Sequence, residues 1–215
     1  ATRFVRWWRD GYLACGGQTY DVGNVTMMAL FQYIQTGNPY CQVTSEHAAG
    51  TGAIIRMAPI GLFYAATPAM LVEYAKYASM ITHAAPSAVS ASQVVAVLLA
   101  RTLYCHDKAH LLTNAWPCAP LHDTIQEVLD GSYRTRQPPH IVNSSHVVRT
   151  LEAALWCLWH YDAYADGILA LANLGGRSDA TCVVYGQIAG ALYGEDAIPA
   201  TWSAQLLRRD EILWY

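Results

Sequence analysis

Apolar residues recur at every third or fourth position along most of the 215-residue chain, the spacing that lets a helix bury one face. Residues 24–36 carry such a stripe, and Gly37 follows as a stop signal. Residues 87–105 are apolar on most sides, which predicts a buried central helix. No segment alternates between apolar and polar residues as a half-buried strand does. We therefore expect an all-α protein with about eight to ten helices, above the average helical share.

Shorter signals predict the remaining helices. Thr67 and Pro68 mark a helix start with a hydroxyl cap and a proline in the first turn, and this helix should run to about Met80. Further helices are expected over residues 121–129, 148–158, 182–193 and 203–213. Residues 130–145 lack periodicity and contain one glycine and two prolines, so we expect a long loop there.

The composition indicates a chain with a large buried core. Hydrophobic residues make up 53% of it and charged residues only 13%, so we expect a single domain over residues 1–215. The net charge is -3, which favours neither nucleic acid nor an anionic membrane as a partner. The apolar run over residues 94–100 ends at Arg101, far short of the roughly 20 residues that a membrane span needs.

The cysteines and the start of the chain bear on the compartment. No basic segment followed by an apolar one precedes the first helix, so no secretory leader is visible. The six cysteines are scattered and form no Cys-x-x-Cys pair, which favours buried, reduced thiols of an intracellular, cytoplasmic protein; disulfides are the alternative. They are Cys15, Cys41, Cys105, Cys118, Cys157 and Cys182.

The segment Gly50-Thr51-Gly52 has the makings of a phosphate-binding loop. Two glycines let the backbone approach a phosphate closely, and the apolar run that follows can start a helix with free N–H groups. Arg56 can add a charge-assisted hydrogen bond. The alternative is a tight turn into a core helix, with Arg56 in a structural ion pair.

A glycine-rich stretch near the C-terminus carries the clearest family pattern. Residues 173–181 read Asn-Leu-Gly-Gly-Arg-Ser-Asp-Ala-Thr, and residues 185–191 read Tyr-Gly-Gln-Ile-Ala-Gly-Ala. This resembles the C-terminal signature of the ADP-ribosylglycohydrolase family, Asn-Leu-Gly-Gly-Asp-Ala-Asp-Thr followed by a helix that opens Tyr-Gly-Gln-x-Ala-Gly-Ala. Here Arg177 stands at the first Asp position and Ala180 at the Thr position, while Asp179 is kept.

Weaker blocks of the same family occur in the same order along the chain. Each is short, but their order and spacing together extend the resemblance over most of the sequence. The blocks are residues 20–26, 50–59, the Thr-His pair at 82–83, Leu-Glu-Ala-Ala-Leu-Trp at 151–156, and Ile-Pro-x-x-Trp at 198–202.

The resemblance implies a fold and a ligand site. It implies a single compact orthogonal helical domain of the ADP-ribosylglycohydrolase type over residues 1–215, shortened at its N-terminus relative to the family. In the family the loop matching 50–59 holds ADP-ribose, and the position of His83 contacts the ribose and phosphate region; a histidine satisfied within the core is the alternative. The ligand-binding residues implied are Gly50, Thr51, Gly52, Arg56, His83, Gly175 and Gly176.

The catalytic magnesium of the family does not match this sequence. The family supplies hard oxygen ligands from an N-terminal Thr-Asp-Asp block and from the C-terminal Asp-x-Asp-Thr. No Thr-Asp-Asp occurs here, and Asp179 alone remains as a residual metal ligand. A guanidinium repels a cation and a methyl group cannot bind one, so Arg177 and Ala180 predict a degenerate site. Arg177 is expected to occupy the vacated position and pair with Asp179.

Three interpretations follow. The first is a protein of this fold that binds ADP-ribose or an ADP-ribosylated protein without hydrolysis and without a cofactor. The second is an active hydrolase that removes ADP-ribose from protein side chains through magnesium-activated water, which requires an upstream segment that supplies Thr-Asp-Asp. The third is a structural or protein-interaction role with no ligand.

Overall fold

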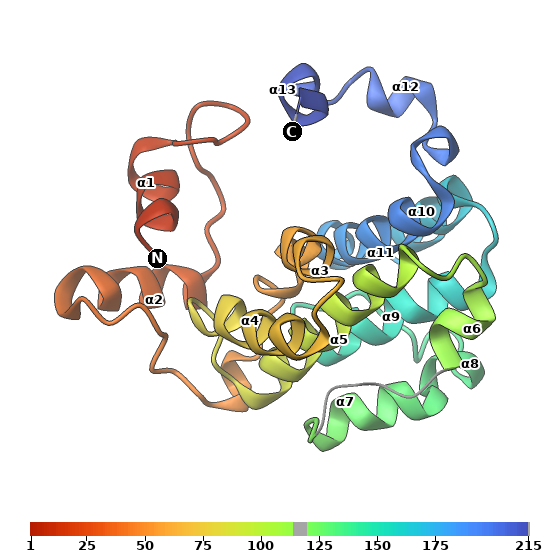
Figure 1. The fold of residues 1–215 in the computed structure, drawn as a ribbon, viewed down its shortest axis with the longest axis horizontal. Coiled ribbons are helices and arrows are strands. Elements are labelled where there is room, and N and C mark those ends of the chain that lie inside the picture. The colour runs from red at the N-terminus through yellow and green to blue at the C-terminus, as the bar shows by residue number, and fades with distance from the viewer. Residues whose placement is uncertain (114–119, 215) are drawn as a thin grey trace.

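One buried helix, α5 (Pro86–Thr102), forms the centre of the fold (Figure 1). Thirteen of its 17 residues are buried, because alanine, valine, leucine and serine cover every side of it. Helices α3, α4, α9 and α11 all pack against it. The buried central helix predicted over residues 87–105 is confirmed, and it ends slightly earlier.

The computed structural model describes residues 1–113 and 120–214. Within these parts no residue belongs to a β-strand, and a single isolated bridge pairs Gly50 with His146. The α-helices are α1 (Thr2–Asp10), α2 (Asn24–Thr36), α3 (Ala58–Phe63), α4 (Pro68–Met80), α5, α6 (Lys108–Thr113), α7 (Asp123–Glu127), α8 (Tyr133–Thr135), α9 (Val147–His160), α10 (Tyr164–Asn173), α11 (Ser178–Tyr193), α12 (Ala200–Ser203) and α13 (Arg209–Trp214). The shorter turns are η1 (Glu46–Ala48), η2 (Ile54–Arg56), the π-turn η3 (Val128–Ser132) and η4 (Glu195–Ala197). The all-α prediction is confirmed.

Helices α10 and α11 pack unusually closely because glycines lie at their contact. A Cβ added to Gly167 would lie 2.1 Å from the hydroxyl oxygen of Tyr185. On the other helix, a Cβ at Gly186 would lie 3.2 Å from the hydroxyl oxygen of Tyr164. A missing side chain on each helix therefore accommodates a tyrosine from the other, and both helices then cover α9.

The two ends of the chain lie outside this core (Figure 1). Helix α1 has no buried residue, and α2 buries only Ala29 and Leu30. At the other end the single helix expected over residues 203–213 is wrong. Helix α12 ends at Ser203, and Arg208, in the left-handed region with φ of 59°, precedes α13. The apolar spacing continues across this break, but no core covers it to hold one helix together.

Two local expectations also differ from the structure. Helix α4 starts at Pro68 as predicted, but the Thr67 hydroxyl donates back to the Tyr64 carbonyl and does not cap the helix. The expected loop over residues 130–145 is helical in its first part, through η3 and α8. Gly131, with φ of 113°, makes that compact turn possible where the periodicity is lost.

The structure describes five of the six cysteines. Cys15, Cys41, Cys105, Cys157 and Cys182 are free, and Cys118 lies outside the described residues. The expectation of buried thiols is confirmed for Cys41 and Cys157 and is wrong for Cys15, which is exposed. No helix in the described ranges is both long enough and apolar enough to cross a membrane.

Candidate functional site

The glycine loop of residues 50–52 is held against the start of α9. The backbone N–H of Val147 donates to the Ala49 carbonyl at 2.9 Å, and Gly50 forms the isolated bridge with His146. The loop then passes directly into η2, whose Ile54 is fully buried. Its position is therefore set by backbone contacts on both sides, while Thr51 remains partly exposed.

The His83 ring lies directly over this loop. A Cβ added to Gly52 would lie 2.6 Å from His83 Cε1, and one added to Gly50 would lie 3.1 Å from Nε2. The backbone of His83 is fixed by Ser79, whose carbonyl accepts its N–H at 2.8 Å and whose hydroxyl donates to its carbonyl at 2.9 Å. The structure thus brings together three of the residues singled out from sequence, and it explains both glycines by the closeness of the ring.

The guanidinium of Arg56 contacts the same loop and fixes it to neighbouring backbone. Its guanidinium donates to the carbonyl of Gly52, to the carbonyl of Ala78 at 3.0 Å and to the Thr82 hydroxyl at 2.7 Å. The ring of Phe4 covers it, with 4.8 Å between Cζ and the ring centroid. Burial lowers the pKa of Arg56 to about 10. No carboxylate of the described residues pairs with it, so the alternative of a structural ion pair is wrong: neutral oxygens take that place.

The electrostatics of the loop keep His83 neutral. Burial, with the nearby charge of Arg56 as the smaller cause, lowers the pKa of His83 to about 4. At neutral pH the imidazole therefore carries one N–H donor and one bare nitrogen. The positive charge at this site belongs to Arg56, whose guanidinium donates to the carbonyl of Gly52.

The second glycine loop, Gly175-Gly176, needs glycine for conformational reasons. Both residues are left-handed, with φ of 69° and 62°, and they form the sharp entry into α11. The side-chain amide of Asn143 donates at 2.7 Å to the carbonyls of Leu171 and Gly175. A Cβ at Gly176 would lie 2.9 Å from the Asn143 carbonyl. Asn143 therefore holds this loop from the segment that precedes α9.

The residues at the position of the family's C-terminal metal loop lie at the start of α11. Arg177, Ser178 and Asp179 form the exposed or partly exposed first turn of α11. Nowhere in the described ranges do three His, Cys, Asp or Glu side chains gather as a metal site would require. The expected ion pair between Arg177 and Asp179 is also wrong, because these two residues form none. Their exposure lets water solvate each charge separately.

The same short segment borders both glycine loops. Asn143 contacts the 175–176 loop, and His146 and Val147 contact the 50–52 loop. A second link comes from Gln187 of α11, which bonds to the backbone beyond the first loop. Sequence reasoning did not single out Asn143 or Gln187. The presence of Gln187 inside the Tyr-Gly-Gln motif was the available signal; Asn143 had none.

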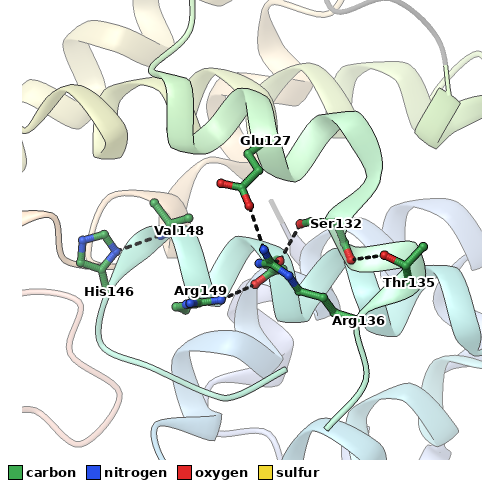
Figure 2. Close-up of polar contacts among 8 residues, drawn as sticks. Glu127, Ser132, Thr135, Arg136, His146, Val148 and Arg149 are labelled. Carbon is green, nitrogen blue, oxygen red and sulfur yellow. Dashed lines mark hydrogen bonds and ion pairs between the residues drawn. The ribbon is translucent and has the colours of Figure 1, made fainter. Parts of the chain in front are cut away.

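A buried carboxylate of α9 holds the part of the chain that leads into this bordering segment (Figure 2). Glu152 of α9 is 1% exposed and pairs with Arg136 at 2.6 Å and Arg149 at 3.0 Å. Ser132 donates to it at 2.5 Å, and Arg136 pairs in addition with Glu127 at 2.8 Å. These contacts fix residues 132–136 against α9, and from there the chain runs to Asn143 and His146. The motif residue Glu152 thus has a structural role.

Two hollows in the surface lie apart from the glycine loops. One of about 270 Å³ is lined by Tyr40, Ile60, Tyr74, Tyr77 and Ile81, together with Ala1, Pro39 and Ala78. The other, of about 570 Å³, lies along residues 195–209. Ala78 lines the first hollow, and its carbonyl accepts a hydrogen bond from Arg56. Neither hollow is lined by residues 50–52 or 175–176.

The described residues thus form an α-helical domain that presents one glycine loop under a buried histidine and a second at a helix entry. The chain belongs to the ADP-ribosylglycohydrolase family, whose sequence profile matches residues 1–214. A solved structure described as an ADP-ribosylglycohydrolase-related protein complex superimposes with a TM-score of 0.84 at 34% identity. That match covers 98% of this chain and 69% of the other.

Named relatives are longer than this chain. The ADP-ribosylarginine hydrolase Tri1 of Serratia proteamaculans is 33% identical over 98% of this chain and 57% of its own length. The ADP-ribosyl-[dinitrogen reductase] glycohydrolase of Rhodospirillum rubrum is 28% identical over 86% of this chain and 60% of its own. The chain thus spans a little over half the length of these curated relatives.

Proposed function

We propose that this chain binds ADP-ribose, or the ADP-ribose group of a modified protein, at the 50–52 loop without hydrolysing it. The observation that carries the proposal is the packing of His83 directly over Gly50 and Gly52. Only glycine fits beneath this neutral imidazole, and the nearby charge of Arg56 attracts a diphosphate to the loop. Thr51, Gly175 and Gly176 are proposed to complete the ligand contacts.

Two residues argue against hydrolysis. The family pattern places oxygen ligands where this chain has Arg177 and Ala180. Two unit charges about 4 Å apart repel by roughly 4 kcal/mol at an effective dielectric near 20, and a divalent ion doubles that. The exposed Asp179 offers one carboxylate against this repulsion. We therefore propose that the chain retains the glycine loops of the ligand site and lacks the metal chemistry.

Calorimetry with ADP-ribose tests the binding. Gly52→Asp adds a side chain whose Cβ would lie 2.6 Å from His83 Cε1, together with a negative charge, so it should displace the ring, repel the phosphates and abolish the binding heat that the parent shows. Equal binding by the two proteins would mean that the ligand lies elsewhere. A parent that binds no ADP-ribose at all would favour the structural or protein-interaction role.

The second candidate is an active hydrolase, because two relatives that are 33% and 34% identical are named ADP-ribosylarginine hydrolase. Its test is release of ADP-ribose from an ADP-ribosylarginine protein, with and without magnesium. We expect no release above the no-protein control. Magnesium-stimulated release by the unmodified chain would contradict the binding proposal. The double variant Arg177→Asp/Ala180→Thr should gain magnesium affinity without gaining turnover.

A further inference from the structure

We infer that Thr82 is a positioning residue: its hydroxyl fixes the tautomer of His83, so that the ring presents Nε2–H to the 50–52 loop. The inference concerns the protonation and orientation of one side chain in the free protein. Its consequence for ligand binding rests on the proposed function.

The argument begins with the partners of the Thr82 hydroxyl. Thr82 is fully buried, and its oxygen accepts a hydrogen bond from Arg56 Nη2 at 2.7 Å. The same oxygen lies 2.8 Å from His83 Nδ1. A guanidinium only donates, so one lone pair of the hydroxyl is already used. The hydroxyl proton therefore needs an acceptor, and the bare Nδ1 of a neutral imidazole is one.

The opposite tautomer leaves the more deeply buried donor without an acceptor, because Thr82 is 0% exposed, whereas His83, whose Nε2 edge faces the loop, is 3% exposed. With the proton on Nδ1, the Thr82 oxygen would accept from both Arg56 and His83, and its own proton would have no acceptor among the recorded contacts. An unpaired donor at a fully buried position is costly, because it has lost its water without gaining a partner. The hydrogen bonds thus run from Arg56 to the Thr82 hydroxyl and from that hydroxyl to His83 Nδ1, which leaves the ring proton on Nε2.

The geometry directs this donor toward the glycine loop. The Nε2 and Cε1 edge of the ring is the part of His83 that lies nearest Gly50 and Gly52. A neutral N–H placed there can donate to an acceptor oxygen of a ligand, either a ribose hydroxyl or a phosphate oxygen. With the proton on Nδ1 the ring would instead present a lone pair, which repels a phosphate oxygen, although a ribose hydroxyl could still donate to it. The tautomer therefore decides whether His83 assists or opposes the binding of a phosphate oxygen.

Nitrogen NMR tests the tautomer without any ligand. In the ¹⁵N-histidine-labelled chain at pH 7, two-bond couplings between ring nitrogens and carbon-bound protons show which nitrogen carries the proton. The signals of His83 are identified as those missing from His83→Gln. We expect Nε2 protonated and Nδ1 bare but hydrogen-bonded. Thr82→Val should move the Nδ1 signal toward that of a free nitrogen, and Thr82→Ser should restore it.

Two NMR outcomes would overturn the inference. One is a proton on Nδ1 in the parent, and the other is an Nδ1 signal that does not respond to Thr82→Val. The matched control is Thr102→Val, because Thr102 is equally buried and its hydroxyl donates to the Leu99 carbonyl at 2.7 Å, away from the loop. This variant should leave the His83 signals unchanged.

Calorimetry then measures the consequence for the ligand. Thr82→Val should weaken ADP-ribose binding about 3- to 10-fold, the worth of one hydrogen bond. Thr82→Ser and Thr102→Val should bind as the parent does. Full affinity in Thr82→Val would overturn the positioning role. A parent that binds no ADP-ribose would overturn the proposed function, while the NMR result would still decide the tautomer.

Discussion

The backbone N–H of Ala58 donates to Gln187 Oε1 at 3.0 Å, joining residues 129 positions apart in sequence. The amide of the same side chain donates to the Ile54 carbonyl at 3.3 Å. Gln187 therefore holds the turn η2, which follows the 50–52 loop, against α11, which follows the 175–176 loop. One side chain thus links the segments that follow the two glycine loops.

Replacing Gln187 by Met should destabilise the fold. The apolar side chain keeps the length but leaves the Ala58 N–H and the Ile54 carbonyl without partners. We expect the free energy of unfolding to fall by about 1–3 kcal/mol, measured by urea denaturation. Gln205→Met is the matched control, because Gln205 is exposed, and its effect should stay within about 0.5 kcal/mol. Equal effects of the two substitutions would mean that the hydrogen bonds of Gln187 do not contribute to the free energy of unfolding.

Gly52→Ala should impair ligand binding through His83. The added methyl group would lie 2.6 Å from His83 Cε1, so the ring must move away from the loop. We expect ADP-ribose affinity measured by calorimetry to fall at least about tenfold, the equivalent of about 1.4 kcal/mol. In contrast, nothing lies within 4 Å of a Cβ at Gly16, and Gly16→Ala should bind as the parent does. Unchanged affinity in Gly52→Ala would mean that the position of His83 over the loop does not affect ligand binding.

Acid should destabilise the protein in part through His83. The pKa of His83 is about 4 in the folded chain against 6.5 for an ordinary histidine. As the pH falls, the unfolded state binds the proton first, so stability is present above pH 6.5 and is lost toward pH 4. This one group contributes a loss of roughly 3 kcal/mol over that window. Denaturation of parent and His83→Gln at pH 7 and pH 4 should show the variant losing less, and equal losses would contradict the burial of a neutral ring.

Arg136→Met should weaken the anchor around Glu152. The substitution removes one of two cations from a carboxylate that is 1% exposed. We expect a loss of about 3 kcal/mol in the free energy of unfolding, because a buried charge is left partly unpaired. The exposed pair of Arg208 and Glu211 is the control, and Arg208→Met should cost only about 0–1 kcal/mol. A loss as small as that of the control would mean that Arg149 alone compensates Glu152.

Local patterns were enough to predict most of the helices. The stripe over residues 24–36 and the start at Pro68 gave α2 and α4 with their observed bounds, because helix periodicity and proline geometry act within a few residues. The sequence also identified both glycine loops and His83 as candidates, through motifs whose residues are short and contiguous.

The partners of those residues were decided only by the tertiary structure. The sequence offered Arg56 as a phosphate ligand or as half of an ion pair, and packing gave its guanidinium two carbonyls and the Thr82 hydroxyl in place of a carboxylate partner. Asn143 and Gln187 link segments that are far apart along the chain, and nothing local marks them. A hydrogen bond depends on where two groups lie in space to within a few tenths of an ångström. Helical periodicity determines which face of a helix is buried, whereas the packing of the helices around α5 determines which polar groups meet.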